Sequence, residues 1–148
     1  MSENIVIIGG GIGGIVAANK LHDKLSSRAR ITLIERNETH TFAASYLWMM
    51  VGQRKGEDIS VPLRSLVNKD VNLVLDEVTR IDTSNQRIET AYQTIDYDYL
   101  ILATGAALDK KFLNRAEEDI HDFYSFEGAR NLKDALNEIG SGEIVIAI

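Results

Sequence analysis

The chain has 148 residues, 45% of them hydrophobic and 26% charged, which is typical of one globular domain or of one domain and part of another. The formal net charge of −6, without a long run of Lys and Arg, argues against nucleic acid as a partner. The absence of cysteine excludes disulfides, thiolate metal sites and a cysteine nucleophile within these residues.

Two further features of the sequence concern the compartment in which the protein works. No apolar run approaches the roughly 20 residues that span a membrane, and the first predicted strand begins without a preceding signal peptide. The lack of disulfides also fits a reducing compartment. We therefore expect a soluble, cytoplasmic chain.

The first predicted elements are a strand and a helix that are joined by glycines. Residues 5–8 are Ile-Val-Ile-Ile, typical of a buried parallel strand, and the apolar spacing becomes helical from Ile12 onward. Gly9, Gly11 and Gly14 fit the G-x-G-x-x-G pattern. The first glycine makes a tight turn, the second lets backbone approach a pyrophosphate, and the third lets the helix pack against the sheet. The pattern therefore predicts a dinucleotide at the start of this helix.

A carboxylate follows at the spacing that a dinucleotide fold requires. The helix is predicted to end near Leu25, and residues 30–35 are predicted to form the second strand. Glu35 closes that strand 21 residues after Gly14, where an acid accepts hydrogen bonds from the adenosine ribose. Such a carboxylate would repel a 2′-phosphate, which disfavours NADP. The alternative is a glutamate at a strand end that only contacts water.

The segment from residue 37 to about 61 is rich in aromatic and methionine side chains. Two interpretations remain open for it. It is either a helical insert that packs Trp48 and the methionines into the core, or a wall along a planar cofactor. In the second case, the small side chains of Ala44 and Ser45 would allow close approach. Pro62 then predicts the start of a short helix.

Short strands are predicted to follow. Residues 71–75 are expected to form a third strand, and the runs 77–81, 86–90 and 94–97 are expected to form an antiparallel meander. A buried strand then ends in Ala103-Thr104-Gly105. These small residues can be simple turn chemistry. They can equally let backbone approach the same dinucleotide, because parallel strands bring their carboxyl ends to one crevice.

The last third of the chain begins with a polar stretch at residues 107–124. It contains Glu117-Glu118-Asp119 and His121, whose spacing fits no metal-ligand motif, and we interpret this run as acidic surface. Ser125 predicts the cap of a helix that ends before Gly140. Residues 143–148 predict another buried strand. Because such a strand needs neighbours, we expect a longer polypeptide, a homo-oligomer or pairing with a complementary chain.

Three features together resemble one protein family: the glycine motif with its Glu35, the meander, and the run Tyr-Asp-Tyr-Leu-Ile-Leu-Ala-Thr-Gly at residues 97–105. They are similar to the N-terminal half of flavoprotein reductases with two dinucleotide-binding domains. The aromatic segment 42–48 is most similar to sulfide:quinone oxidoreductases. Type II NADH dehydrogenases and the flavoprotein subunit of flavocytochrome c sulfide dehydrogenase are close relatives.

The resemblance implies an α/β fold. Residues 1–106 would form a Rossmann-like FAD-binding domain, with a parallel sheet and a β-meander insert. Residues 107–124 would be a linker, and residues 125–148 would supply the first helix and strand of a second, truncated nucleotide-binding domain.

The resemblance also implies FAD at the glycine motif, with no metal and no assigned catalytic residue. It places Glu35 at the adenosine ribose, Arg36 beside the adenine and Val78 near the adenine. Ser45 would lie against the isoalloxazine, although the prolines that relatives often carry between residues 43 and 47 are absent here. The predicted FAD-binding residues are Gly9, Gly11, Ile12, Gly13 and Gly14 at the pyrophosphate, Glu35, Arg36, Ser45 and Val78, and Ala103, Thr104 and Gly105 near the phosphate and ribitol.

Three functions remain open. The first is a sulfide:quinone oxidoreductase, in which a cysteine pair oxidises sulfide and the flavin passes electrons to quinone. The alternatives are an NADH-dependent flavoprotein like type II NADH dehydrogenase, or a non-catalytic module that binds FAD or its ADP half. Because the chain lacks those cysteines, we expect it to be catalytically incomplete alone. The quinone site and peripheral membrane contact would lie elsewhere in the full-length protein.

Overall fold

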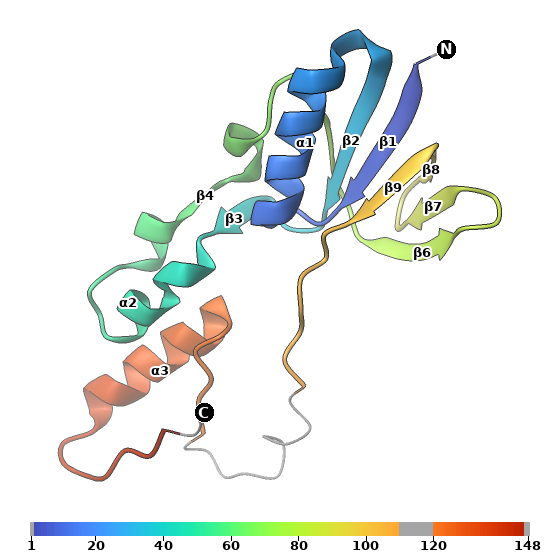
Figure 1. The fold of residues 1–148 in the computed structure, drawn as a ribbon. Coiled ribbons are helices and arrows are strands. Elements are labelled where there is room, and N and C mark those ends of the chain that lie inside the picture. The colour runs from blue at the N-terminus through green and yellow to red at the C-terminus, as the bar shows by residue number, and fades with distance from the viewer. Residues whose placement is uncertain (1, 110–119, 147–148) are drawn as a thin grey trace. The chain divides into compact units, whose positions relative to one another are not determined.

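The computed structural model describes residues 2–109 and 120–146 (Figure 1). The chain forms two compact units. The first consists of Met1–His40 and Val61–Ala106, and the second of Thr41–Ser60 and Ala107–Ile148. The acidic run 117–119 and the last two residues of the chain, on which sequence predictions were made, lie outside the described residues.

A four-stranded parallel sheet organises the first unit, in the order β5-β2-β1-β9. Its strands are β1 (Glu3–Ile8), β2 (Ala29–Glu35), β5 (Asn72–Leu75) and β9 (Tyr99–Leu102). β1 lies between two neighbours, which fits its unbroken run of buried apolar residues. The predicted α/β class and the predicted parallel strands are confirmed, although β9 is shorter than expected. The prediction that this last strand is buried is wrong, since Tyr99 and Leu102 are 55% and 61% exposed at the edge of the sheet.

The two faces of this sheet are covered by different elements. Along β1, Ile5 and Ile7 point to the face covered by α1 (Ile12–Leu25), where Ile15 and Ala18 are also buried. Val6 and Ile8 point to the opposite face and pack in a cluster with residues of the meander. The alternation follows from the period of two along a strand. Two 3₁₀ turns, Ser26–Arg28 and Leu63–Leu66, complete the unit, and the second confirms the short helix predicted after Pro62.

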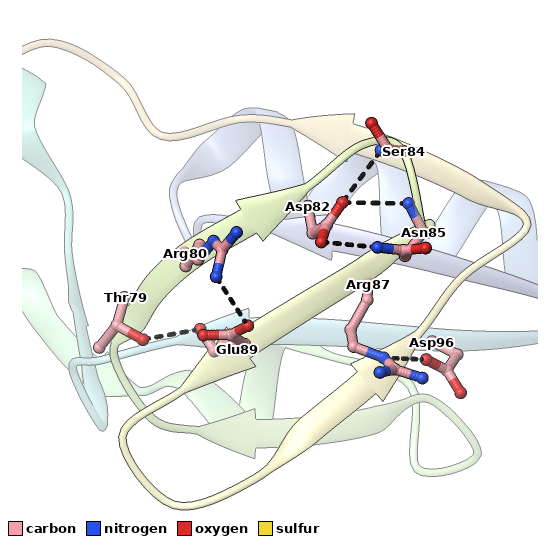
Figure 2. A network of polar contacts seen from close by, with 8 residues as sticks. All are labelled: Thr79, Arg80, Asp82, Ser84, Asn85, Arg87, Glu89 and Asp96. Atoms are coloured by element: carbon pink, nitrogen blue, oxygen red, sulfur yellow. Dashed lines mark hydrogen bonds and ion pairs between the residues drawn. The ribbon is translucent and has the colours of Figure 1, made fainter.

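The predicted meander is confirmed as a three-stranded antiparallel sheet of β6 (Val78–Asp82), β7 (Arg87–Thr90) and β8 (Thr94–Asp96). Its exposed surface carries cross-strand polar contacts (Figure 2). Arg80 pairs with Glu89 at 3.6 Å, and Arg87 pairs with Asp96 at 2.8 Å. Because these side chains are largely in water, they align the strands more than they stabilise the fold. The buried side of β7 is held by Ile88, which is fully inaccessible.

Asp82 closes the turn between β6 and β7, as Figure 2 shows. Its Oδ1 accepts hydrogen bonds from the backbone amides of Ser84 and Asn85, at 3.1 and 3.0 Å. Its Oδ2 accepts from Asn85 Nδ2 at 2.9 Å, and this side-chain hydrogen bond is the main cause that lowers the pKa of Asp82. The tight turn therefore prefers an ionised aspartate at this position.

Asp76 links the end of β5 to the meander. Its carboxylate is buried and accepts hydrogen bonds from the amides of Glu77, at 2.8 Å, and Tyr92, at 3.2 Å. Hydrogen bonding from the Thr90 side chain is the largest cause that lowers the pKa of Asp76, and burial opposes it. The ionised form of Asp76 thus ties the connection between β5 and β6, through Glu77, to the turn between β7 and β8, through Tyr92.

The second unit contains short helices. It includes the 3₁₀ turns Ala43–Ser45 and Gly56–Ile59, and the helices α2 (Tyr46–Met50) and α3 (Phe126–Glu138). Strands β3 (Thr39–Thr41) and β4 (Ser60–Pro62), within which the chain passes from one unit to the other, form a two-stranded sheet. Ser125 caps α3 as predicted, because its Oγ accepts a hydrogen bond from Gly128 N at 2.9 Å.

The small core of this unit tests the interpretation of residues 37–61 as a helical insert that packs Trp48 and the methionines. Tyr46 and Met49 are buried with Ile59 and Ala129, and the ring of Phe126 meets that of Tyr46 edge-on at 6.1 Å. The helical insert and the buried methionine are therefore confirmed. Trp48 does not belong to this core, since 43% of it is exposed.

The strand predicted at residues 143–148 is wrong over the part that the structure describes. Residues 143–146 form no strand, and the exposed fractions of Ile144, Val145 and Ile146 are 59%, 83% and 72%. A strand exists only when a neighbour accepts and donates its ladder hydrogen bonds. Within the described residues, this segment pairs with no strand, so its β-prone sequence is not sufficient.

Candidate functional site

The carboxyl ends of the parallel strands lie at one edge of the sheet in the first unit. Ile8 at the end of β1 is aligned with Ile34 of β2 and with Leu102 of β9. The chain leaves this edge in turns that bond directly to neighbouring strands. Gly9 N donates to Ile34 O at 2.9 Å, and Ala103 N donates to Ile8 O at 2.8 Å. The structure thus brings the glycine motif and the small residues after β9 together, as the sequence predicts.

Two glycines of the motif are required by the fold itself. Gly9 has a φ of +109°, and an ideal Cβ there would lie 2.2 Å from the carbonyl oxygen of Ala103. An ideal Cβ on Gly14 would lie 1.8 Å from the carbonyl oxygen of Gly9. Both positions therefore need glycine so that β1, the turn, α1 and β9 can approach one another.

Gly11 and Gly13 differ from this pair, because a Cβ at either position would meet no atom within 4 Å. Gly11 also has an ordinary φ of −73°, so the fold does not need glycine there. Gly11, at the N-cap of α1, and Gly13, in its first turn, are both exposed, as is Ile12. The missing side chains leave open space next to backbone that a ligand can approach.

The start of α1 is suited to an anion. No side chain caps the helix at Gly11, and its first turn contains no acidic residue. The amide groups of a first turn lack partners within the helix, and the helix dipole is positive there. The glycine surface and the uncapped amides together fit a phosphate group.

Glu35 ends β2 beside the glycine loop and makes three hydrogen bonds within the protein. Its Oε2 accepts from Gly10 N at 2.6 Å, and its Oε1 accepts from Asn37 N and Nδ2, both at 2.9 Å. A carboxylate has about four acceptor positions. This arrangement leaves about one acceptor position, on Oε2, for a ligand hydroxyl. Glu35 is therefore a support of the loop as well as a candidate ligand contact.

Gly10 and His40 are part of the site that sequence reasoning missed. Gly10 is buried, and a Cβ there would lie 2.8 Å from Glu35 Cγ and 2.9 Å from Leu63 Cδ2. Its carbonyl oxygen contacts His40 Nδ1 at 3.1 Å. The sequence signal for Gly10 is weak: it is the middle one of three consecutive glycines, at a position where the motif tolerates any residue. His40 gave no signal, because its contact depends on the path of the chain after β2.

The remaining predicted residues of the first unit are exposed or pack elsewhere, although the backbone N of Thr104 would lie 3.1 Å from a Cβ on Gly9. Arg36 is exposed and pairs with Glu77 at 3.5 Å. Val78 is half-buried and packs on the cluster beneath the meander. Thr104 and Gly105 are exposed, and Gly105 has a φ of +71° with open space around a Cβ.

Ser45 is the one predicted FAD-binding residue in the second unit. It is 1% exposed, and its hydroxyl accepts a hydrogen bond from Arg54, whose guanidinium lies 4.9 Å from the ring centre of Trp48. Ser45 thus has an internal role in that unit, and its contact with a flavin stays a prediction.

No group of three or more His, Cys, Asp or Glu side chains in residues 2–109 and 120–146 is arranged to hold a metal ion. Over the same ranges, no helix combines the length and the apolar character needed to cross a membrane.

Comparison with known proteins identifies relatives along most of the chain. Residues 3–146 match the family described as pyridine nucleotide-disulphide oxidoreductase. A sulfide-quinone reductase of Aquifex aeolicus is 37% identical over 110 residues, which are 73% of this chain and 25% of that protein. A type II NADH:quinone oxidoreductase of Staphylococcus epidermidis is 37% identical over 105 residues, which are 70% of this chain and 26% of the relative. The chain thus spans about a quarter of the length of these relatives.

Similarity to a solved structure extends over a larger part of the chain. The crystal structure of the sulfide:quinone oxidoreductase from Aquifex aeolicus superimposes with a TM-score of 0.78. The sequence identity is 29%, and the match covers 93% of this chain and 32% of that protein.

Proposed function

Because this chain belongs to the pyridine nucleotide-disulphide oxidoreductase family, we propose that the glycine edge of its parallel sheet binds FAD. The observation that carries this proposal is the open space at Gly11 and Gly13 beside the uncapped start of α1. The pyrophosphate would occupy that space and accept hydrogen bonds from the backbone between Gly9 and Gly14. The remaining acceptor position on Glu35 Oε2 would take one hydroxyl of the adenosine ribose.

The other predicted residues would then contact the rest of the cofactor. Arg36 and Val78 would border the adenine, and Ala103, Thr104 and Gly105 would lie near the phosphate and ribitol. Ser45 would lie against the isoalloxazine. In this proposal, residues 1–106 are the FAD-binding domain, residues 107–124 are a linker and residues 125–148 begin a second nucleotide-binding domain.

For the whole protein, the proposed activity is that of a sulfide:quinone oxidoreductase. The structural likeness to the Aquifex aeolicus enzyme over 93% of the chain supports it. Bound FAD would supply two-electron transfer between a small-molecule donor and quinone. The chain would bind and orient the cofactor, and a cysteine pair for sulfide would come from other residues, since none occurs here. Quinone access would involve peripheral contact with a membrane through other parts of the protein.

A second candidate is NADH:quinone oxidation. The type II NADH:quinone oxidoreductase of Staphylococcus epidermidis has the same 37% identity as the sulfide-quinone reductase, so identity alone does not separate the two activities. Both candidates use the same FAD site and the same acceptor class. They differ in the donor that reduces the flavin.

The test is anaerobic reduction of the purified full-length protein, which would include the cysteine pair that these residues lack, followed by flavin absorbance. The expected result is a yellow protein that sulfide bleaches rapidly and that a soluble quinone reoxidises. Rapid bleaching by NADH, with none by sulfide, would favour the second candidate. A colourless protein that takes up NAD but not FAD would contradict both. A folded Gly11→Val variant without flavin provides the control for cofactor-dependent signals.

A further inference from the structure

Both backbone polar groups of Gly10 are held by side chains from other elements. Its N–H donates to Oε2 of Glu35, at the end of β2, with a distance of 2.6 Å. Its carbonyl oxygen lies 3.1 Å from Nδ1 of His40, in β3. Gly10 is buried and surrounded so closely that a Cβ would collide with Glu35 and Leu63. The middle of the glycine loop is therefore fixed on both sides of one residue.

The chemistry of the contact defines the state of the histidine ring. A carbonyl oxygen can only accept a hydrogen bond, so Nδ1 of His40 must carry the hydrogen. Both the neutral ring with its hydrogen on Nδ1 and the imidazolium satisfy this requirement. The carboxylate of Glu35, in contrast, accepts from the amide of the same residue. The two side chains therefore hold Gly10 through bonds of opposite direction, which fixes its orientation as well as its position.

The neighbours of Gly10 explain why this orientation matters. Gly9 has a φ of +109°, and Gly11 is exposed with no atom near its Cβ position. Glycine has more backbone freedom than other residues, so three consecutive glycines would be mobile without side-chain contacts. A loop that is ordered before the ligand arrives loses less entropy on binding.

We propose that His40 is a positioning residue of the dinucleotide site. It orients the glycine loop through the Gly10 carbonyl, so that the amides from Gly11 onward face the phosphates before the ligand binds. The identity of the ligand in this inference rests on the proposed function, whereas the effect of His40 on the order of the loop rests on the contacts of Gly10 alone. His40 touches Gly10 and need not touch the cofactor.

The experiment compares two variants of the purified protein. His40→Leu removes the donor, and His40→Asn restores an N–H near the position of Nδ1. Hydrogen exchange of the Gly9 and Gly10 amides, which bond to Ile34 and Glu35, should be about three- to tenfold faster without ligand in His40→Leu, the effect of losing one hydrogen bond. The dissociation constant for FAD should rise about three- to tenfold. His40→Asn should return both values toward wild type. His22→Leu, which removes a histidine beside Asp70 in the same unit, should leave both unchanged.

The outcomes separate this inference from the proposed function. Faster exchange in His40→Leu with no FAD binding by the wild type would support the positioning role and contradict the FAD proposal. Unchanged exchange and unchanged affinity in folded His40→Leu would overturn the positioning role. If His40→Leu does not fold, the ring ¹⁵N shifts of the wild type decide. Hydrogen on Nδ1 supports the inference, and a neutral ring with hydrogen only on Nε2 overturns it.

Discussion

Gly14 lies so close to Gly9 that an ideal Cβ on Gly14 would be 1.8 Å from the Gly9 carbonyl oxygen. At Gly11, three residues earlier, a Cβ would meet nothing within 4 Å. The glycine motif therefore combines positions that build the fold with positions that leave room for a ligand. Substitutions can separate these two roles experimentally.

The first prediction is that Gly14→Ala destabilises the protein by about 3 kcal/mol, because the added methyl group forces α1 away from the turn. Urea denaturation followed by circular dichroism measures this change. Gly13→Ala in the same helix turn is the control, since its Cβ faces open space. It should be neutral or stabilising by up to about 1 kcal/mol. Equal stability of the two alanine variants would contradict the steric argument.

The second prediction is that Gly11→Val folds normally but does not retain FAD. Its φ of −73° suits a β-branched residue, while the side chain would fill the space proposed for the pyrophosphate. The melting temperature and the flavin absorbance of the same preparation give the two results. A folded Gly11→Val protein that stays yellow would show that the phosphates bind elsewhere.

The third prediction concerns Glu35 as a support of the loop. In Glu35→Gln, one acceptor oxygen becomes a donor group that faces the amide of Gly10 or the donors of Asn37. The free energy of unfolding should fall by about 1 to 3 kcal/mol. Glu38→Gln, at an exposed position in the same segment, should change it by less than about 0.5 kcal/mol. If both variants are as stable as wild type without ligand, Glu35 does not support the loop.

The fourth prediction compares two isoleucines that face each other across β6 and β7. Ile88 is fully buried against the parallel sheet, whereas 36% of Ile81 is exposed. Ile88→Ala should cost about 2 to 5 kcal/mol, because it leaves a cavity in the core. Ile81→Ala should cost clearly less. Calorimetric melting of both variants measures these losses in stability. Similar losses for Ile88→Ala and Ile81→Ala would contradict the prediction that the buried side chain of Ile88 anchors the meander in the core.

The fifth prediction is a pH dependence that originates at Asp76. Its pKa is lowered in the folded protein from the ordinary value of 3.8. The unfolded state therefore binds the proton more readily, so Asp76 contributes stability above about pH 4 that is lost as the pH falls through the folded pKa. The stability difference between wild type and Asp76→Asn should be largest near neutral pH and shrink in acid. Urea midpoints measured from pH 3 to 7 check this, and a difference that is constant over the range would contradict it.

The elements that the sequence predicted correctly are those with a strong local pattern. The β-branched run 5–8, the glycine motif and the Ser125 cap each depend on residues that are close in the chain. The contact between His40 and the Gly10 carbonyl could not be predicted, because it depends on the path of β3 in the folded protein. The strand expected at residues 143–148 was wrong for a related reason. Its apolar residues allow a strand, but pairing depends on a neighbour that local sequence does not encode.

The order of strands has a consequence for synthesis of the protein on the ribosome. β1 emerges first, yet it lies between β2 and β9, and Asp98 bonds to Asn4 across 94 residues of sequence. Until β9 has been translated, one edge of β1 stays open to pairing with other chains, and such distant contacts form slowly. The turn at Gly9 receives its neighbour Ala103 only then. A nascent chain that stalls before residue 99 would therefore expose an unpaired strand edge, and its glycine loop would lack the neighbour that β9 brings to it.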